Sequence, residues 1–182
     1  MGQAQIPRRV KYFCGLLLAP AAPHAEVEAA LEQLFGPIIS RSATLPFTQT
    51  AYYEREMGPT LTRTFLAFGP LRPMDDLAEV KHATNQLEAS WSDARRQRQV
   101  NLDPGYLDLA KVVLATTKDY SHRLYIGTGI YAEITLRYQQ KRFQPWPWTY
   151  PDYRESIALD FFAQLREIYK GQLREESSHT GD

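Results

Sequence analysis

The sequence predicts an α+β fold in a single domain, with a ferredoxin-like (split βαβ) core that is extended by an antiparallel β-meander and a C-terminal helix. One reason is composition: the 182 residues are 43% hydrophobic and 23% charged, which is typical of one globular domain with its own core. A second is the order strand, helix, strand, strand, helix, strand over residues 10–102. A third is a group of three β-rich segments over residues 111–138. Two smaller sheets that share the helices are the alternative.

The first strand is expected over residues 10–19, where apolar side chains occupy both faces after Lys11. This pattern is typical of a central strand that is covered above and below. A helix is expected over residues 25–35 and ends at Gly36-Pro37. Its apolar residues recur at helical spacing, at Val27, Ala30, Leu31, Leu34 and Phe35. A weaker strand follows over residues 38–45.

The second half of this core repeats the pattern with a strand over residues 61–68. A helix then begins at Asp76, where the D-x-x-E sequence is related to a capping box. One stripe of that helix carries Leu77, Val80, Thr84, Leu87 and Trp91. Asp103-Pro104-Gly105 is strong turn chemistry, because proline presets φ and glycine tolerates positive φ. We therefore expect a β-turn there that reverses a strand around residues 98–102.

The meander is expected to comprise strands over residues 111–116, 122–126 and 130–138. A short glycine-bearing loop, Gly127-Thr128-Gly129, predicts a tight hairpin between the second and third. That hairpin places Leu124 opposite Ala132 and Arg123 opposite Glu133. The five residues before His122 make the other connection and place Thr116 opposite His122.

Side chains alternate between the two faces of a sheet, so this register assigns each residue to a face. The face expected to join the core carries Val112, Leu114, Leu124, Ile126, Ile130, Ala132, Ile134 and Leu136. The opposite face carries Lys111, Val113, Ala115, Arg123, Tyr125, Tyr131, Glu133, Thr135 and Arg137. A ligand, a partner or water is expected on that second face.

Residues 145–151 alternate prolines with two tryptophans, Trp146 and Trp148, which forbids a regular helix. We expect an ordered arm that packs against the body, with a ligand or partner patch as the alternative. A final helix is expected over residues 152–170, with Gly171 as its stop. The domain then spans residues 1–172, and residues 173–182 form a polar tail that is expected to be disordered.

Several segments resemble one bacterial family. The segments NLDPGYL, KVVLATTKDYSHRLYIGTGIYAEITL and WTYPDYR are similar to the family of unknown function DUF4416. KYFCGLLLAP and PFTQTAYYEREMG extend the resemblance over nearly the whole chain. The resemblance implies a bacterial cytoplasmic protein. It implies no activity, cofactor or catalytic residue.

Composition and motif searches exclude several classes of function. The formal net charge of zero argues against a dedicated binder of duplex DNA. The longest apolar run, residues 12–22, is much shorter than the about 20 residues that span a bilayer, and no signal peptide is evident, so a cytoplasmic location is expected. The single cysteine, Cys14, lies in that run and is expected to be a buried hydrophobe. The sequence contains no GxxxxGK[ST], GxGxxG, GxSxG, HExxH or CxxC, so no cofactor is assigned and no metal site is predicted.

The remaining candidates lie at turns and on the polar face of the meander. His122 is the candidate general acid or base, and Asp103 is a second catalytic candidate. The candidates for ligand binding are Lys111, Lys118, Arg123, Tyr125, Tyr131, Glu133 and Arg137, because arginine binds phosphate or carboxylate through a planar fork and tyrosine offers stacking area. Each candidate also has a purely structural interpretation: Asp103 caps the backbone at a turn, His122 is a hydrogen-bonded histidine of the core, and Arg123 and Glu133 form an ordinary cross-strand ion pair.

Three functions are consistent with these residues. The preferred hypothesis is that the protein binds a small anionic or phosphorylated ligand, with or without turning it over, and that Asp103 and Glu133 could then ligate a metal. The second is a binding module for a nucleotide or single-stranded nucleic acid on the Tyr125/Tyr131 face. The third is a protein-interaction component that makes contact through the Trp146/Trp148 arm or the sheet face. Whether the protein is an enzyme is left open.

Overall fold

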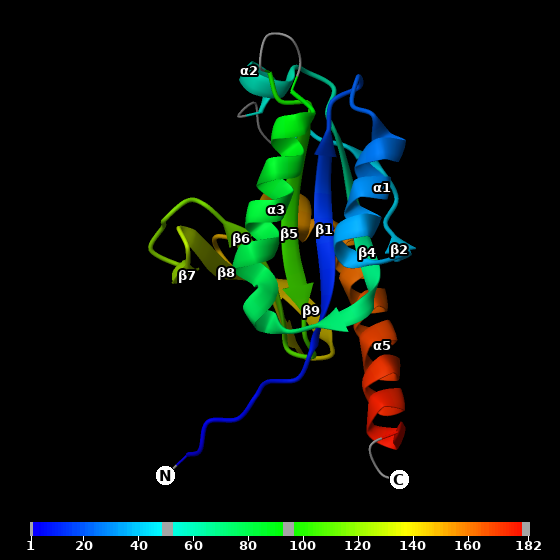
Figure 1. The fold of residues 1–182 in the computed structure, drawn as a ribbon, viewed down its shortest axis with the longest axis vertical. Coiled ribbons are helices and arrows are strands. Elements are labelled where there is room, and N and C mark those ends of the chain that lie inside the picture. Colours follow the sequence, from blue (N-terminus) through cyan, green and yellow to red (C-terminus); the bar gives the residue numbers. More distant parts are fainter. Residues whose placement is uncertain (1, 49–52, 93–96, 180–182) are drawn as a thin grey trace.

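The computed structural model describes residues 2–48, 53–92 and 97–179 (Figure 1). Its strands form one antiparallel sheet in the order β2-β4-β1-β5-β6-β8-β7, with β3 paired to β4 and β9 to β8. The α+β class, the antiparallel sheet and the C-terminal helix are therefore confirmed. The elements are β1 (Val10–Leu18), α1 (His24–Phe35), β2 (Ile38–Arg41), β3 (Leu45–Pro46), α2 (Glu54–Met57), β4 (Thr62–Arg72), η1 (Met74–Asp76), α3 (Leu77–Ser90), β5 (Val100–Leu107), β6 (Lys111–Thr116), β7 (Leu124–Gly127), β8 (Ile130–Gln139), β9 (Arg142–Pro145), α4 (Pro151–Arg154) and α5 (Ser156–His179).

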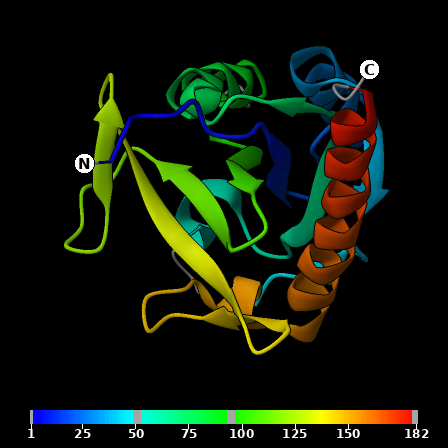
Figure 2. The same cartoon turned by 90° about the horizontal axis from the view of Figure 1, so that it is seen from below.

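Strand β1 is central, as its two apolar faces predict, and all nine of its residues are buried. Tyr12, Cys14 and Leu16 pack on one side with residues of α1 and α3. Phe13 packs on the other side with aromatic residues of α4 and α5, among them Phe162. Figures 1 and 2 show α1 and α3 together on one side of the sheet and α5 on the other.

The expected turn at Asp103-Pro104-Gly105 is wrong, because all three residues lie inside β5. This strand pairs with β1 along its whole length, and that long ladder outweighs the local turn preference. Gly105 is needed for close packing rather than for a turn: a Cβ there would collide with the Val113 carbonyl and lie 2.7 Å from the Phe13 ring.

Pairing between β5 and β6 is short, and this opens the sheet. It runs only from Gly105 opposite Leu114 to Leu107 opposite Val112. The next residue back along β5 is Pro104, which has no backbone N–H to donate. The first half of β5 and the end of β6 are therefore not paired with each other.

The predicted meander has the wrong strand order. Strand β6 pairs with β8, and β7 lies beyond β8 at the edge of the sheet. Thr116 is accordingly opposite Tyr131 rather than His122. The connection over residues 117–123 forms no strand, which allows the longer β8 to take the edge of β6. Within the β7–β8 hairpin, the predicted pairing of Leu124 with Ala132 is confirmed.

The predicted division into a core face and a polar face is also wrong in part. A register shift lets Thr135 bulge out of β8, so that Leu114 lies opposite Glu133 and shares its face. In the hairpin, the expected core residues Leu124, Ile126 and Ile134 are 75%, 39% and 41% exposed.

The C-terminal helix differs from prediction at both ends. It begins after an extended residue, Glu155, that separates it from α4. It continues through Gly171 to His179, so the expected stop at Gly171 is wrong. A single glycine costs a helix only about 1 kcal/mol, and Leu173 packs against the core beyond it. Of the tail predicted to be disordered, residues 180–182 lie outside the described residues. No helix in the described part of the chain has the length and apolarity to cross a membrane.

Candidate functional site

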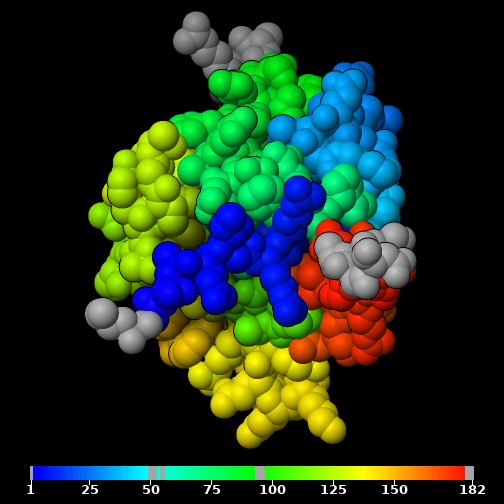
Figure 3. All heavy atoms as spheres, turned by 60° about the horizontal axis from the view of Figure 1, so that its bottom comes forward, coloured from blue at the N-terminus to red at the C-terminus, as the bar shows by residue number. Residues whose placement is uncertain are grey.

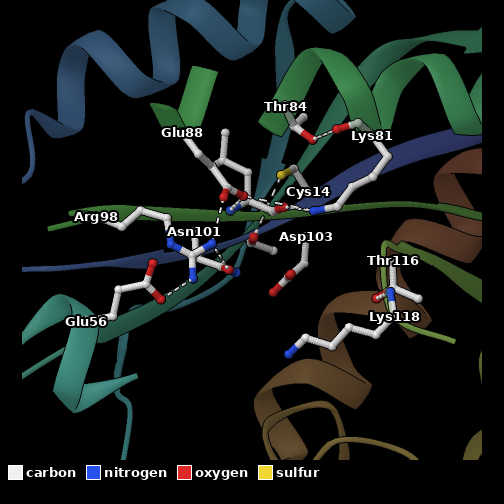
Figure 4. Close-up of polar contacts among 12 residues, drawn as sticks. Cys14, Glu56, Lys81, Thr84, Glu88, Arg98, Asn101, Asp103, Thr116 and Lys118 are labelled. Carbon is white, nitrogen blue, oxygen red and sulfur yellow. Dashed lines mark hydrogen bonds and ion pairs between the residues drawn. The ribbon is translucent and has the colours of Figure 1, made fainter. Parts of the chain in front are cut away.

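A cleft of about 460 Å³ lies where β5 and β6 separate. Its walls come from β4, α3, β5, β6, β8, the 117–123 connection and the start of α4. Among the described residues, eight charged side chains line it: the cations Arg63, Lys81, Arg98, Lys118 and Arg123, and the carboxylates Glu88, Asp103 and Glu133. Figure 4 shows the part of this cluster around Asp103.

Side chains of helix α3 hydrogen-bond the backbone groups of β5 that have no partner on β6. The backbone N–H of Leu102 donates to Glu88 Oε1 at 2.7 Å, and its carbonyl accepts from Lys81 Nζ at 2.9 Å. Lys81 and Glu88 are seven residues apart, so they lie on the same face of the helix. Two charged side chains therefore replace the neighbouring strand (Figure 4), and both are buried at the cleft.

Arg98 ties this end of the cleft together. Its guanidinium donates to Glu88 and to Glu56, each at 2.8 Å, and to Asn101 Oδ1 at 3.2 Å. Because Arg98 precedes β5 and Glu56 belongs to α2, these bonds hold three separate segments around the same opening.

Arg63 is the buried cation at the base of the cleft. Its Nη1 donates to Asp103 at 3.0 Å, and its Nε lies 2.7 Å from Asp152. The hydroxyl of Tyr153 is buried beside this group and has no hydrogen-bond partner among the described residues. Gly15 leaves room for it, since a Cβ there would lie 2.8 Å from that hydroxyl.

The carboxyl groups of the cleft respond differently to their surroundings. Burial alone would raise the pKa of Asp103, but the charges of Arg63 and Lys81 outweigh burial and lower it. Burial raises the pKa of Glu88, and Lys81 offsets this only in part. Burial likewise raises the pKa of Asp152. The site thus holds carboxyl groups with opposite tendencies to keep a proton.

The opposite wall is built around Arg123 and Glu133. Arg123 Nε donates to Glu133 at 2.7 Å, and the other two nitrogens donate to the Lys118 carbonyl at 3.0 Å and the Tyr150 hydroxyl at 2.9 Å. His122 Nε2 lies 3.2 Å from the same Glu133 oxygen. Both members of the Arg123–Glu133 pair are almost wholly buried.

Beside this wall, four rings form what we call the ring stack: Trp146, Trp148, His122 and Tyr120, of which Tyr120 also lines the cleft. Their successive centroids are 5.0, 5.2 and 6.1 Å apart, with planes within 17° of parallel. An arginine covers each terminal ring, because Arg137 lies 4.2 Å from the Trp146 centroid and Arg123 lies 4.6 Å from that of Tyr120.

Two hydrogen bonds to backbone carbonyls of β8 also hold the arm in place. Trp148 Nε1 donates to the Ile134 carbonyl at 3.0 Å, and the Thr149 hydroxyl donates to the carbonyl of the bulged Thr135 at 2.5 Å. These contacts support the interpretation of residues 145–151 as an ordered arm that packs on the body.

Comparison with known families shows to which family the chain is related. Residues 8–169 match the family described as Domain of unknown function (DUF4416). The chain belongs to this family. Comparison of the DUF4416 chain with the curated proteins gives no significant match. Comparison with the solved structures gives none either.

The DUF4416 fold brings four of the nine candidate residues into the cleft: Asp103, Lys118, Arg123 and Glu133. His122 is adjacent but does not line it, since it packs in the ring stack. Tyr125 and Tyr131 meet edge to face outside the cleft, with planes 63° apart. Two cations are engaged elsewhere: Lys111 with Asp108 at 2.5 Å, and Arg137 with Trp146.

Sequence reasoning missed the other half of the DUF4416 cleft, namely Arg63, Lys81, Glu88, Arg98 and Tyr153. The sequence offered two signals. One was Arg63, a lone arginine in the apolar 61–68 strand, and the other was the pair of charges Lys81 and Glu88 beside the apolar stripe of the following helix. They become informative only when β4 and α3 are placed against β5. Within the described part of the chain, no three His, Cys, Asp or Glu side chains come together as a metal site would require.

Proposed function

We propose that the protein binds a small anionic or phosphorylated ligand in the cleft between β5 and β6. The observation that carries this proposal is the charge of the lining, where five cationic side chains face three carboxylates. A volume of about 460 Å³ is in the range of sites that take small molecules. The buried Tyr153 hydroxyl, which lacks a partner among the described residues, adds support.

The two lysines are the best candidates to hold the anion. Three of the five N–H donors of Arg123 are used within the protein, so Arg123 offers an anion its charge and at most two further donors. Lys81 and Lys118 line the cleft from α3 and from the connection after β6, each with a compact ammonium group of three donors. One Lys81 donor is already used by the Leu102 carbonyl, and its Nζ lies 4.0 Å from Glu88, so an anion there would bind the remaining donors. Figure 4 shows Lys118 extended toward the space beside Asp103.

A calorimetric titration with pyrophosphate tests this proposal. Lys118→Ala removes one ammonium group from the cleft and should weaken binding about tenfold, as expected for one charge-assisted contact. Lys170→Ala is the matched control, because it removes the same charge from α5 beside Glu167. Equal affinities in the two variants, or no heat of binding in the wild type, would refute the proposal.

A second candidate function is turnover of that ligand. Asp103 supports it, because this carboxyl group lines the cleft and the charges of Arg63 and Lys81 outweigh burial and lower its pKa, so that it stays a carboxylate able to act as a base. Asp103→Asn should then abolish hydrolysis of a phosphorylated substrate while pyrophosphate still binds; undiminished hydrolysis would remove Asp103 from the mechanism.

The other hypotheses have less support from the geometry. A planar base needs an open ring face, whereas Tyr125 and Tyr131 meet edge to face. The Trp146/Trp148 rings are engaged in the ring stack, which favours a structural role over a partner contact. A nucleic-acid ligand, a protein partner at the arm, and a bacterial cytoplasmic location stay predictions.

We also propose that the first part of the chain is a split βαβ, ferredoxin-like unit to which the remaining strands and α5 are added. The strand order β2-β4-β1-β5, with antiparallel pairing throughout, supports it. In this interpretation the cleft marks the junction between the unit and its extension.

A further inference from the structure

The edge strand β7 differs from the rest of the sheet in what it leaves exposed. It is the last strand in the sheet order and pairs on one side only, with β8, in the described part of the chain. The β7–β8 hairpin stands away from α1 and α5 in Figures 1 and 2, and in the space-filling view it lies along one side of the molecule (Figure 3). Another strand could reach this edge.

Large apolar side chains concentrate beside that edge. Ten are exposed among the described residues, and six of them belong to this hairpin and the arm beside it: Leu124, Tyr125, Ile126, Ile134, Trp148 and Tyr150. Leu124 and Tyr125 are the most exposed of the six, at 75% and 63%. Exposed large apolar side chains on both faces of one edge strand leave apolar surface that a pairing strand would cover.

The opposite edge of the same sheet is protected. Strand β2 carries Arg41, which pairs with Glu28 of α1, and it follows Pro37. A register shift also interrupts its pairing with β4 at Ile39. Charge, proline and irregular pairing are the usual means of keeping an edge strand from pairing with other chains. Strand β7, with the sequence LYIG, has no charged residue and no proline.

We propose that a second copy of this chain pairs with the free edge of β7 to form a twofold dimer with a continuous sheet. The free backbone groups of an edge strand form a template to which another strand can hydrogen-bond. The strand is uncharged, so it can face itself without repulsion, and the formal net charge of zero removes repulsion between whole molecules.

The register of this pairing follows from the length of the free edge. Gly127 has φ +114°, which is not extended, so the usable edge is Leu124, Tyr125 and Ile126. Three residues pair fully with themselves only when the twofold axis passes beside the middle one. Tyr125 then faces the Tyr125 of the second copy, and Leu124 packs beside the second copy's Ile126 on the other face.

Light scattering after size exclusion, over a range of chain concentrations, tests the dimer. The full-length protein should associate, and Ile126→Lys should make it monomeric by placing charge on the edge. Ile39→Lys is the matched control, since Ile39 and Ile126 have nearly equal exposure, 42% and 39%, on opposite edges of one sheet. A wild-type monomer at every concentration, or a dimer that survives Ile126→Lys, would overturn the proposal.

A cysteine cross-link tests the register in the same protein. The only native cysteine, Cys14, is buried and leaves the background low. Tyr125→Cys should give a disulfide-linked dimer on mild oxidation, whereas Ile39→Cys should stay largely monomeric. Equal cross-linking of the two variants would show collision rather than pairing at β7.

Discussion

The cleft and the ring stack use the same kinds of side chain for different ends. In the ring stack each ring lies against another ring or a guanidinium, and the rings hold the arm on β8. In the cleft the charges face a gap between two strands, and the buried hydroxyl of Tyr153 has no partner among the described residues. The comparison teaches that aromatic and basic residues form a structural clamp when they close on one another. They form a candidate binding site when the backbone holds them apart.

The largest effect should come from Glu133, which the two regions share. It accepts from Arg123 of the cleft and lies beside His122 of the ring stack. Glu133→Gln leaves a buried guanidinium without its carboxylate, so the free energy of unfolding should fall by about 3 kcal/mol in urea denaturation. Glu167→Gln breaks an exposed ion pair and should leave the unfolding curve nearly unchanged. If the two variants behave alike, the Arg123–Glu133 pair does not join the two regions.

A smaller effect should separate the regions. Trp148→Ala removes a ring from the middle of the stack and should lower the free energy of unfolding by about 2 kcal/mol, because the ring is only partly buried. Ile168→Ala provides a control of equal exposure, at 36%, on α5. Pyrophosphate affinity should stay within about twofold of wild type in Trp148→Ala. A tenfold loss would mean that the stack belongs to the binding site.

The smallest effect should appear in the pH dependence of stability. The folded pKa of Asp103 is lowered, so its contribution is present above the ordinary aspartate pKa and is lost as pH falls through the folded value. The folded pKa of Glu88 is raised, so its contribution is present below the ordinary glutamate pKa and is lost as pH rises through the folded value.

Urea denaturation of Asp103→Asn and Glu88→Gln between about pH 3 and about pH 7 measures how much each carboxyl group contributes to the pH dependence of stability. Asp103→Asn should flatten the acid side of the stability curve. Glu88→Gln should remove part of the decline toward neutral pH. Parallel curves for wild type and both variants would contradict the assigned directions.

Local pattern was sufficient where a feature depends on neighbouring residues. The apolar alternation of β1 predicted a strand buried on both faces, and the glycine loop predicted the hairpin that pairs Leu124 with Ala132. The Arg123–Glu133 pair followed from the same hairpin. Each of these depends on a turn or a period within a few residues.

The sequence pattern did not predict the features that depend on contacts between residues far apart in the sequence. Asp103-Pro104-Gly105 has turn chemistry, yet eight pairings with β1 hold it in a strand. The bulge at Thr135 and the placement of β8 beside β6 depend on which strand pairs with β6, and this is a contact between residues distant in the sequence. For the same reason half of the candidate site was predicted and half was not. Arg63, Lys81 and Glu88 become neighbours of Asp103 only through sheet order and helix placement.

The most direct test of the cleft is anomalous diffraction from crystals soaked in tungstate, a heavy analogue of small oxyanions, in a lattice that leaves the cleft open. The account predicts a strong peak inside the cleft, within reach of Lys81 and Lys118, and its loss in crystals of Lys118→Ala. Peaks confined to the outer surface, with the cleft of the wild type empty, would contradict it.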